Sequence, residues 1–445
     1  MRVSIDIVAL GQGGEGVGSF EGRTIFVPFT APGDRVLVEL PSGKGPGRAD
    51  LLEIVAPASG RVAAPCRHFG PGEGAGCGGC EWQHLAYEDQ VAAKERAFAQ
   101  TLRRIGALAE GSYASAPAVR SPSPLRYRVR AKFHFDRKEG RLVFFRRRSH
   151  ERVQVRECHL LEPELDSLRE STGAALSRVG LDVREATLEW SRHQGRGAAH
   201  LRVASPGPAS RKRAEALLAA LPALTGVVLG TEGAPPILVG DPVLKHERVP
   251  GRPEAGLQRS RPDVFQQANR AANALLVEKA LELLEPAGED VLELFCGAGN
   301  FTAPISACAR SVCAIEAQGP SLDLARADMA ELSRERSARV RFFAGDWLAL
   351  ARAFGRETGR GRGRFRVALL DPPREGARGV GPALRDLGVG RAVYVSCDPA
   401  TLARDLKTCR EAGYRVAAVQ AIDLFPQTHH LEAVALMVCD QQLGR

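Results

Sequence analysis

A cysteine stands where an apolar run gives way to a polar one, in the stretch AVYVSCDPATLARDL at residues 392–406. The β-branched run predicts a strand, and Asp398-Pro399 is typical of a helix start. The positive end of a helix dipole favours a thiolate, so we expect Cys397 to be a nucleophile. A thiolate that adds to C6 of a pyrimidine makes C5, otherwise inert, able to attack an electrophilic methyl group. The competing interpretation is a small buried hydrophobic residue.

Methylation at C5 leaves a proton there, and a base must remove it before the thiolate departs. Glu432 begins the last apolar run, residues 432–440, at a sheet end where a carboxylate would normally be excluded. We predict that Glu432 is this base, against the alternative of a surface carboxylate. The neighbouring His429 and His430 are alternative bases or metal ligands, but adjacent residues seldom bind one metal ion, and we expect them to shape the site.

A glycine-rich turn, ELFCGAGNF at residues 293–301, follows a predicted strand and opens a helix. Gly297 and Gly299 allow the backbone to approach a ligand closely. Glu316 ends the next strand, where a carboxylate can accept both ribose hydroxyls of a nucleoside. The third glycine of a dinucleotide-binding fingerprint is missing, so a nucleoside without a pyrophosphate, such as S-adenosylmethionine, fits better. A purely structural glycine turn is the alternative.

The motif DPPR at residues 371–374 ends another predicted strand. Its prolines stiffen the loop and present Asp371 on a rigid arm. A similar loop holds a planar nitrogen in amino-group methyltransferases, but there an aromatic residue follows the prolines, and here Arg374 does. A simple strand terminator is the remaining interpretation.

Strands and helices alternate from about residue 262 to the end of the sequence. A helix at 267–285 precedes the first strand of this region. The alternation predicts a doubly wound, Rossmann-like α/β domain over residues 262–445, whose ligands bind outside the carboxyl ends of its strands. Those ends carry Phe295, Glu316, Asp346, Asp371 and Cys397. The strands are predicted at 291–295, 311–316, 340–346, 365–373, 392–397, 414–425 and 432–440.

Two further parts precede this domain. Residues 1–56 contain short strands broken by glycine turns, which predict a small antiparallel β-barrel of a kind that presents a basic face to nucleic acid. Residues 57–261 mix strands and helices and predict a central α+β domain. The helix predicted at 86–106 is amphipathic, and we expect it to pack on the C-terminal domain.

Four of the ten cysteines form a possible metal site. Cys66, Cys77 and Cys80 lie on a glycine-rich loop, and Cys158 follows in VRECHLLEPEL. In a large chain that we expect to be cytosolic, clustered thiols indicate metal binding or catalysis rather than disulfides. These four suit zinc or a [4Fe–4S] cluster, and the spacing does not choose between them. Four unrelated thiols are the alternative.

A net charge of +9 favours a polyanionic partner such as nucleic acid, although a GC-rich genome also enriches arginine. The strictly alternating stretch LRYRVRAKFHF, residues 125–135, predicts a strand with one basic face. Repulsion along that face favours contact with an RNA backbone over a solvated edge strand. The basic residues are Arg126, Arg128, Arg130, Lys132 and His134.

The start of the sequence lacks the features of a signal peptide. No apolar run approaches the roughly 18 residues of a membrane span. We therefore predict a cytoplasmic protein without a membrane partner.

Five motifs together resemble the RNA uracil-C5 methyltransferases that make 5-methyluridine: SCDPATLARD, FPQTHHLE, DPPR, LFCGAGNF and FQQAN, the last at residues 265–269. The resemblance spans essentially the whole chain, and the N-terminal barrel resembles the OB-like TRAM domain of that family. It implies a class I methyltransferase domain with Cys397 as nucleophile and Glu432 as proton acceptor. By similarity, the S-adenosylmethionine site comprises Gln267, Phe295, Asn300, Glu316 and Asp371.

The resemblance also implies a [4Fe–4S] cluster on Cys66, Cys77, Cys80 and Cys158, which selects iron–sulfur over zinc. The gap between the first two of these cysteines is longer than is usual in the family. Members with both barrel and cluster mostly resemble bacterial 23S ribosomal RNA enzymes, so 23S rRNA is favoured over transfer RNA, with the target base flipped out of its stack.

Three other functions stay open from the sequence. They are a tRNA uridine-C5 methyltransferase, an amino-group methyltransferase that uses the DPPR loop, and a non-catalytic iron–sulfur RNA-binding protein. No obligate protein partner is evident.

Overall fold

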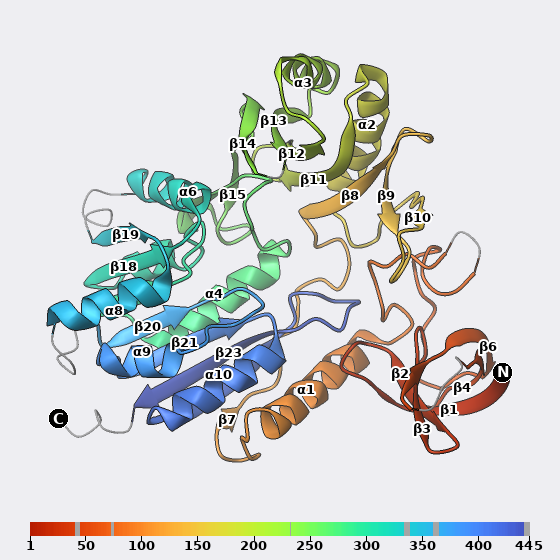
Figure 1. Ribbon diagram of the computed structural model, residues 1–445, viewed down its shortest axis with the longest axis horizontal. Coiled ribbons are helices and arrows are strands. Elements are labelled where there is room, and N and C mark those ends of the chain that lie inside the picture. The colour runs from red at the N-terminus through yellow and green to blue at the C-terminus, as the bar shows by residue number, and fades with distance from the viewer. Residues whose placement is uncertain (41–44, 73–74, 232, 333–338, 359–364, 440–445) are drawn as a thin grey trace.

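The computed structural model contains three parts, each built on its own β-sheet (Figure 1). It describes residues 1–40, 45–72, 75–231, 233–332, 339–358 and 365–439. Figure 1 shows the N-terminal sheet at lower right, the central sheet at the top and the C-terminal sheet at left. Among the described residues, none of the helices is both long and apolar enough to cross a lipid bilayer.

The N-terminal part is a six-stranded sheet rolled around its own apolar cluster, in which Ile7, Ile25 and Val36 are almost completely buried. Alternate residues of the short strands face this cluster, as the period of two in a strand requires. Pairing is antiparallel except between β3 and β5. In order across the sheet, the strands are β5 (Gly47–Arg48), β3 (Arg23–Val27), β2 (Gly16–Phe20), β1 (Arg2–Leu10), β4 (Arg35–Glu39) and β6 (Asp50–Ala56).

The central part is a seven-stranded mixed sheet covered by helices α2 (Pro163–Val179) and α3 (Pro208–Ala220). Its strand β8 begins at Arg130, five residues later than predicted, because the backbone at Arg126 has a left-handed φ of 54°. In order, the strands are β10 (Arg152–Val153), β9 (Arg141–Phe145), β8 (Arg130–Asp136), β11 (Val183–Ser191), β12 (Arg196–Val203), β13 (Leu224–Thr231) and β14 (Ala234–Gly240). A two-stranded sheet, β15 (Leu244–Glu247) and β16 (Leu257–Ser260), with the 3₁₀ turn η1 (Pro253–Ala255), connects this part to the next.

The C-terminal part is an eight-stranded sheet with helices on both faces, which confirms the predicted Rossmann-like domain. Strands β17 to β21 run parallel, and β23 is antiparallel to both of its neighbours. In order, the strands are β19 (Val340–Ala344), β18 (Ser311–Glu316), β17 (Asp290–Leu294), β20 (Val367–Leu370), β21 (Arg391–Ser396), β23 (Glu432–Cys439), β22 (Tyr414–Ile422) and β7 (Ala114–Ser115). The helices are α4 (Arg270–Leu284), α5 (Thr302–Ser306), α6 (Gly319–Ala330), α8 (Trp347–Thr358), α9 (Val380–Asp386) and α10 (Pro399–Glu411).

Capping side chains start the two helices that lie next to the predicted site. Asn269 accepts a hydrogen bond from the Ala272 amide and begins α4. Asp398 accepts bonds from the amides of Ala400 and Thr401, both at 2.9 Å, and Pro399 occupies the first position of α10. These side chains satisfy amides that have no partner inside the helix, so the start of α10 is fixed directly after Cys397.

Helix α1 (Tyr87–Arg104) joins the N-terminal half of the chain to the C-terminal sheet. It packs against α10 and β22 through Phe98 and Leu102, and Figure 1 shows it running between the N-terminal sheet and the C-terminal part. The ammonium of Lys94 forms an ion pair of 2.6 Å with the carboxylate of Asp423, and both side chains are about 1% exposed. Lys94 also donates to the Phe425 carbonyl at 3.0 Å, so α1 is bound to the loop that follows β22.

We expect Lys94→Met to lower the free energy of unfolding by about 3–5 kcal/mol, because the Asp423 carboxylate would stay buried without its partner. Urea denaturation of the full chain measures this change. Arg120→Met is the matched control, since it breaks an exposed pair with Glu88 at 3.4 Å and should cost less than about 1 kcal/mol. Equal effects of the two substitutions would contradict the assigned role of the buried pair.

Candidate active site

The C-terminal sheet reverses its strand order between β17 and β20. The chain continues from β17 to β18 and β19 on one side, whereas β20 leads to β21 on the other. Ligands of such sheets bind in the crevice at this reversal, outside the carboxyl ends of the strands. The loops that begin at Phe295 and Asp371 follow these two strands, so the predicted cofactor residues lie at the position where the topology opens a crevice.

Left-handed backbone angles determine the shape of the glycine turn after β17. Phe295, Gly297 and Gly299 have φ angles of 61°, 54° and 80°, values that favour glycine and strain Phe295. A Cβ added at Gly297 would meet no atom within 4 Å, so the turn faces open space there. The carboxylate of Glu316 accepts hydrogen bonds from the amides of Gly297 at 3.0 Å and Gln318 at 2.8 Å, which fixes it beside the turn.

Two asparagine side chains connect the glycine turn to helix α4. Asn300 and Asn273 exchange side-chain hydrogen bonds of 2.9 and 3.0 Å, and Gln267 lies buried just before the helix. The sequence prediction included Asn300 and Gln267 but missed Asn273. The pattern that could have identified Asn273 is a polar residue one helical turn after the cap Asn269, on the buried face of α4.

Strand register brings Cys397 and Glu432 together. Strands β21 and β23 are antiparallel, and Ser396 pairs with Ala433 at the end of the ladder. The next positions outward are Cys397 and Glu432, which therefore face each other across the two strands. Cys397 is half-buried and Glu432 is 2% exposed. A thiol and a carboxyl group 35 positions apart in the sequence thus share one edge of the sheet.

The pKa of the Cys397 thiol is raised to about 12, first by burial and then by the negative charge of Glu432. The sequence led us to expect a thiolate favoured by the helix N-terminus, and this expectation is wrong for the ligand-free chain. Burial and the neighbouring carboxyl groups outweigh the helix dipole. The sulfur therefore keeps its proton at neutral pH.

The carboxyl groups beside Cys397 also have raised pKa values. Burial raises the pKa of Asp371 to about 7, and burial together with Asp371 raises the pKa of Glu432 well above its usual range. The guanidinium of Arg374 acts in the opposite direction on Glu432 and on Cys397. Arg374, which the sequence presented only as a departure from an aromatic pattern, is therefore a cation that faces the reacting groups.

The loop between β22 and β23, residues 423–431, is held by three separate segments. Gln90 of α1 donates to the Gln427 side chain at 3.0 Å and accepts from its amide at 2.8 Å. The amides of Glu81 and Trp82 both donate to the Gln427 carbonyl. Tyr127 donates to the Pro426 carbonyl at 3.0 Å. These contacts fix the loop immediately before Glu432.

The histidines of this loop contact the segment after Cys80. The Glu81 carboxylate lies 3.4 Å from His429 Nδ1, and the His429 and His430 rings are 4.3 Å apart. The expected shaping role of the two histidines stays a prediction, and the contact with Glu81 could not be predicted from spacing.

The four predicted cysteine ligands line one cavity of about 40 Å³, whose other walls include Phe69, Phe144 and Leu161. Within the described ranges, no group of three or more His, Cys, Asp or Glu side chains is arranged to hold a metal ion. The described structure therefore does not confirm the predicted metal site. The four that share the cavity are Cys66, Cys77, Cys80 and Cys158.

N–H groups surround the sulfur atoms of this cavity. Gln83 Nε2 donates to Cys80 Sγ at 3.1 Å, and the amides of His68, Gly79 and Leu160 donate to the other three sulfurs. Such bonds favour thiolates and tune metal–thiolate centres. Burial nevertheless raises the pKa of all four thiols, so these bonds offset only part of its effect.

The basic stretch 126–132 does not present one continuous face. Arg126 pairs with Glu157, and Arg130 pairs with Glu189 and donates to the carbonyl of Val264 at 2.6 Å. The remaining two point elsewhere: Arg128 and Lys132 both line a large groove beside His429.

The sequence and structure of the chain are similar to those of known proteins. A family model described as tRNA (Uracil-5-)-methyltransferase matches residues 240–439. The chain is 34% identical to 23S rRNA (uracil(1939)-C(5))-methyltransferase RlmD of Alkalilimnicola ehrlichii, over 98% of this chain and 97% of the relative. RlmD of Pectobacterium atrosepticum is 32% identical, over 99% and 94%.

The fold is also similar to that of a solved structure. The crystal structure of Pyrococcus abyssi tRNA (uracil-54, C5)-methyltransferase in complex with S-adenosyl-L-homocysteine superposes with a TM-score of 0.73. That match covers 98% of this chain and 99% of the other at 22% identity, which establishes a shared fold over the full length.

We expect iodoacetamide to alkylate Cys397 at least about tenfold more slowly than the exposed Cys308 at pH 8, because burial and Glu432 suppress the reactive thiolate. Peptide mass spectrometry over a time course measures both rates in one sample. Glu432→Gln removes the adjacent charge and should accelerate the reaction at Cys397 while leaving Cys308 unchanged. Equal rates at the two cysteines in the wild-type chain would contradict the raised pKa.

Proposed function

Because this chain belongs to the family of RNA uracil-C5 methyltransferases, we propose that it methylates C5 of a uridine in structured 23S ribosomal RNA, with S-adenosylmethionine as the methyl donor. One observation carries the proposal beyond family membership. The register of β21 and β23 places the thiol of Cys397 opposite the carboxyl group of Glu432, and C5 methylation needs a nucleophile and a base at adjacent positions.

The reaction begins when the sulfur of Cys397 adds to C6 of the uracil ring. The thiol proton passes to solvent water, and the electrons of the C5=C6 double bond move toward C5 and the O4 carbonyl. C5 then attacks the methyl carbon of the donor, and the electron pair of the broken S–CH₃ bond stays on the donor sulfur. The positive charge of Arg374, which lowers the pKa of Cys397, stabilises the sulfur anion at both ends of this sequence.

Glu432 completes the reaction as a general base. It removes the proton left on C5, the C5=C6 bond re-forms, and the Cys397 sulfur departs with the electrons of the C6–S bond and regains a proton. Burial raises the pKa of Glu432, which makes its carboxylate a stronger base than an exposed one. Ionisation of Asp371 and Glu432 increases as pH rises, so methyl transfer should become faster from pH 6 to pH 8.

S-adenosylmethionine supplies an electrophilic methyl group when it is bound at the reversal of strand order. Glu316 lies beside the glycine turn with both carboxylate oxygens fixed by amides and is placed to accept ribose hydroxyls. The turn itself leaves room for a ligand at Gly297. The proposed binding residues are Gln267, Phe295, Asn300, Glu316 and Asp371.

Ribosomal RNA is favoured as the substrate because both near full-length relatives described above are named 23S rRNA methyltransferases. Transfer RNA is the alternative within the family. An amino-group methyltransferase would use Asp371 and the DPPR loop but would have no use for a thiol opposite a buried carboxyl group. The Cys397–Glu432 pair therefore supports carbon methylation.

A [4Fe–4S] cluster on Cys66, Cys77, Cys80 and Cys158 is part of the proposal, supported by their common cavity and by the N–H groups that surround the sulfurs. Such a cluster would supply four iron–thiolate bonds that join the loop at 66–80 to Cys158. The rolled N-terminal sheet is proposed to be the TRAM domain of the family, with a role in RNA binding.

We expect Cys397→Ala to abolish transfer of labelled methyl groups to 23S rRNA, because no other thiol in the described structure lies opposite Glu432. Glu432→Gln should reduce turnover by about 10²–10⁴-fold and leave methylated RNA covalently attached to the protein. Denaturing gel electrophoresis with labelled RNA detects this adduct.

Cys308→Ala is the matched control for both variants, since its thiol is exposed and remote from the crevice. It should retain wild-type turnover and form no lasting adduct. Undiminished methyl transfer by Cys397→Ala would contradict the proposed mechanism and favour amino-group methylation.

Protein purified without oxygen should contain about four iron atoms and four sulfide ions per chain, and Cys80→Ser should lose most of both. Elemental analysis and sulfide titration measure the content, and Cys308→Ser should retain it. Stoichiometric zinc or a metal-free wild-type protein would contradict the proposed cluster.

A further inference from the structure

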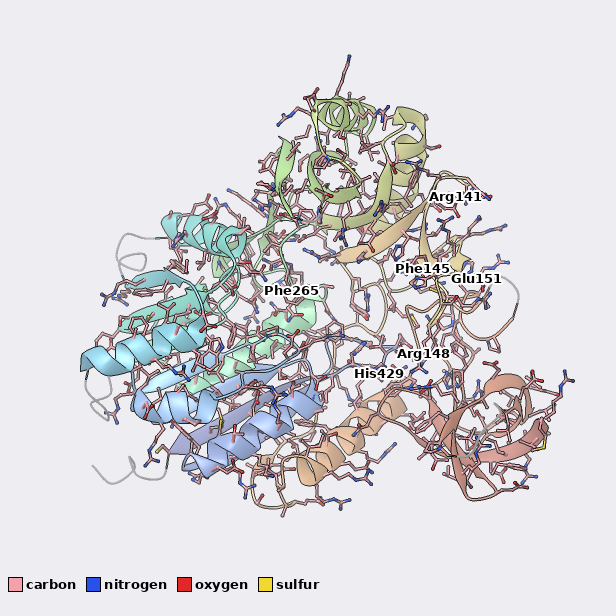
Figure 2. All side chains as sticks on the ribbon, in the orientation of Figure 1. Arg141, Phe145, Arg148, Glu151, Phe265 and His429 are labelled. Atoms are coloured by element: carbon pink, nitrogen blue, oxygen red, sulfur yellow. The ribbon has the colours of Figure 1, made fainter. Side chains whose placement is uncertain are left out.

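A groove of about 590 Å³ lies where all three parts of the chain meet. Gly13 borders it from the N-terminal sheet, strands β8 and β9 form its floor, and His429 closes it on the side of the C-terminal part. Figure 2 shows Phe145, Arg148 and His429 following one another from the central sheet toward the catalytic loop. The proposed reaction at Cys397 and Glu432 does not use this groove, although His429 lies only three residues before the base.

Cationic side chains outnumber carboxylates in the lining of the groove. Its lining contains one carboxylate, Glu81, and five cationic side chains. Several of these cations are paired with acids behind the wall, for example Lys132 with Glu185 at 3.0 Å and Arg146 with Glu151 at 2.8 Å. The five cations are Arg128, Lys132, Arg146, Arg147 and Arg148.

The buried carboxylate of Glu15 organises three guanidinium groups at one end of the groove. Glu15 is 3% exposed, and its Oε1 lies 2.8 Å from Arg148, 3.1 Å from Arg48 and 3.5 Å from Arg147. Three positive charges around one negative charge repel one another, and the charges of Arg148 and Arg48 help to lower the pKa of Arg147 after the effect of burial. Because Arg148 keeps about half of its side chain exposed, the arrangement presents a fixed cation to an anionic ligand.

A pair of stacked aromatic rings lies beside these cations. The rings of His134 and Phe145 stack with their centroids 3.6 Å apart and their planes at 14°, and both line the groove. Burial lowers the pKa of His134, so its ring is neutral at pH 7. Alternating cations and aromatic faces are what single-stranded nucleic acids bind, through phosphates and base stacking respectively. An acidic peptide would use the cations but would have no use for the stacked rings.

We propose that this groove holds a nucleotide next to the target uridine, with its phosphate at Arg148 and its base against the Phe145–His134 stack. The volume lies in the range of about 300–1,000 Å³ that is usual for small-ligand sites, which is the size class of a nucleotide. This inference rests on the proposed function, since it assumes that the substrate is an RNA whose target base is drawn out of its stack toward Cys397.

The experiment compares Arg148→Gln and Phe145→Leu with Arg141→Gln, whose exposed side chain lies on the same sheet outside the groove (Figure 2). Binding of a labelled oligouridylate of about ten nucleotides to the full chain is measured by fluorescence anisotropy over a series of salt concentrations. Arg148→Gln should weaken binding and reduce the salt slope, d log K/d log[salt], by about 0.7 in magnitude, because one phosphate contact is lost. Phe145→Leu should weaken binding about fivefold or more at an unchanged slope.

The same variants are assayed for methyl transfer to unmodified 23S rRNA, where both should raise KM and Arg141→Gln should match wild type. If both groove variants bind oligouridylate with the affinity and salt slope of Arg141→Gln, the groove proposal is overturned even when methylation proceeds. A different outcome separates the two proposals. If the wild-type protein methylates no 23S rRNA, but Arg148→Gln and Phe145→Leu change oligouridylate binding as expected above, the assigned substrate is wrong and the groove assignment stands. Melting temperatures equal to that of wild type confirm that each variant is folded.

Discussion

The buried ion pair between Lys94 and Asp423 is the contact on which the active-site architecture depends. It joins a helix from the first quarter of the chain to the loop that ends at Glu432, and a buried charge pair is stable only while both partners remain in place. Gln90 and Gln427 reinforce it with two further hydrogen bonds. The catalytic loop is therefore positioned by segments outside the Rossmann-like domain, and that domain alone does not determine its conformation.

The same loop connects the catalytic edge with the cysteine cavity and the basic groove. Glu81, the residue after Cys80, lines the groove and contacts His429, while Trp82 donates to the Gly14 carbonyl of the N-terminal sheet at 2.8 Å. RNA in the groove would therefore touch the segment that holds the loop before Glu432. One continuous set of contacts therefore joins the proposed RNA groove to the segment before Glu432.

The electrostatics of the site disfavour the anionic forms of its acidic groups. Burial raises the pKa values of Cys397, Asp371 and Glu432 together, and the charge of Arg374 only partly offsets this effect. Raised pKa values reduce the repulsion that three adjacent anions would exert on one another.

The sequence by itself determined the Rossmann-like domain and the candidate reacting residues, because strand–helix alternation and the placement of Cys397 after a strand are local patterns. It could not determine the pKa of Cys397, since that value depends on burial and on Glu432, which is brought close only by the register of β21 and β23. The sequence also could not show that Arg130 and Lys132 have different surroundings. The guanidinium of Arg130 donates to the Val264 carbonyl and pairs with Glu189, whereas Lys132 lines the groove. Local pattern fixes which elements form, whereas pairing between distant segments decides which charges meet.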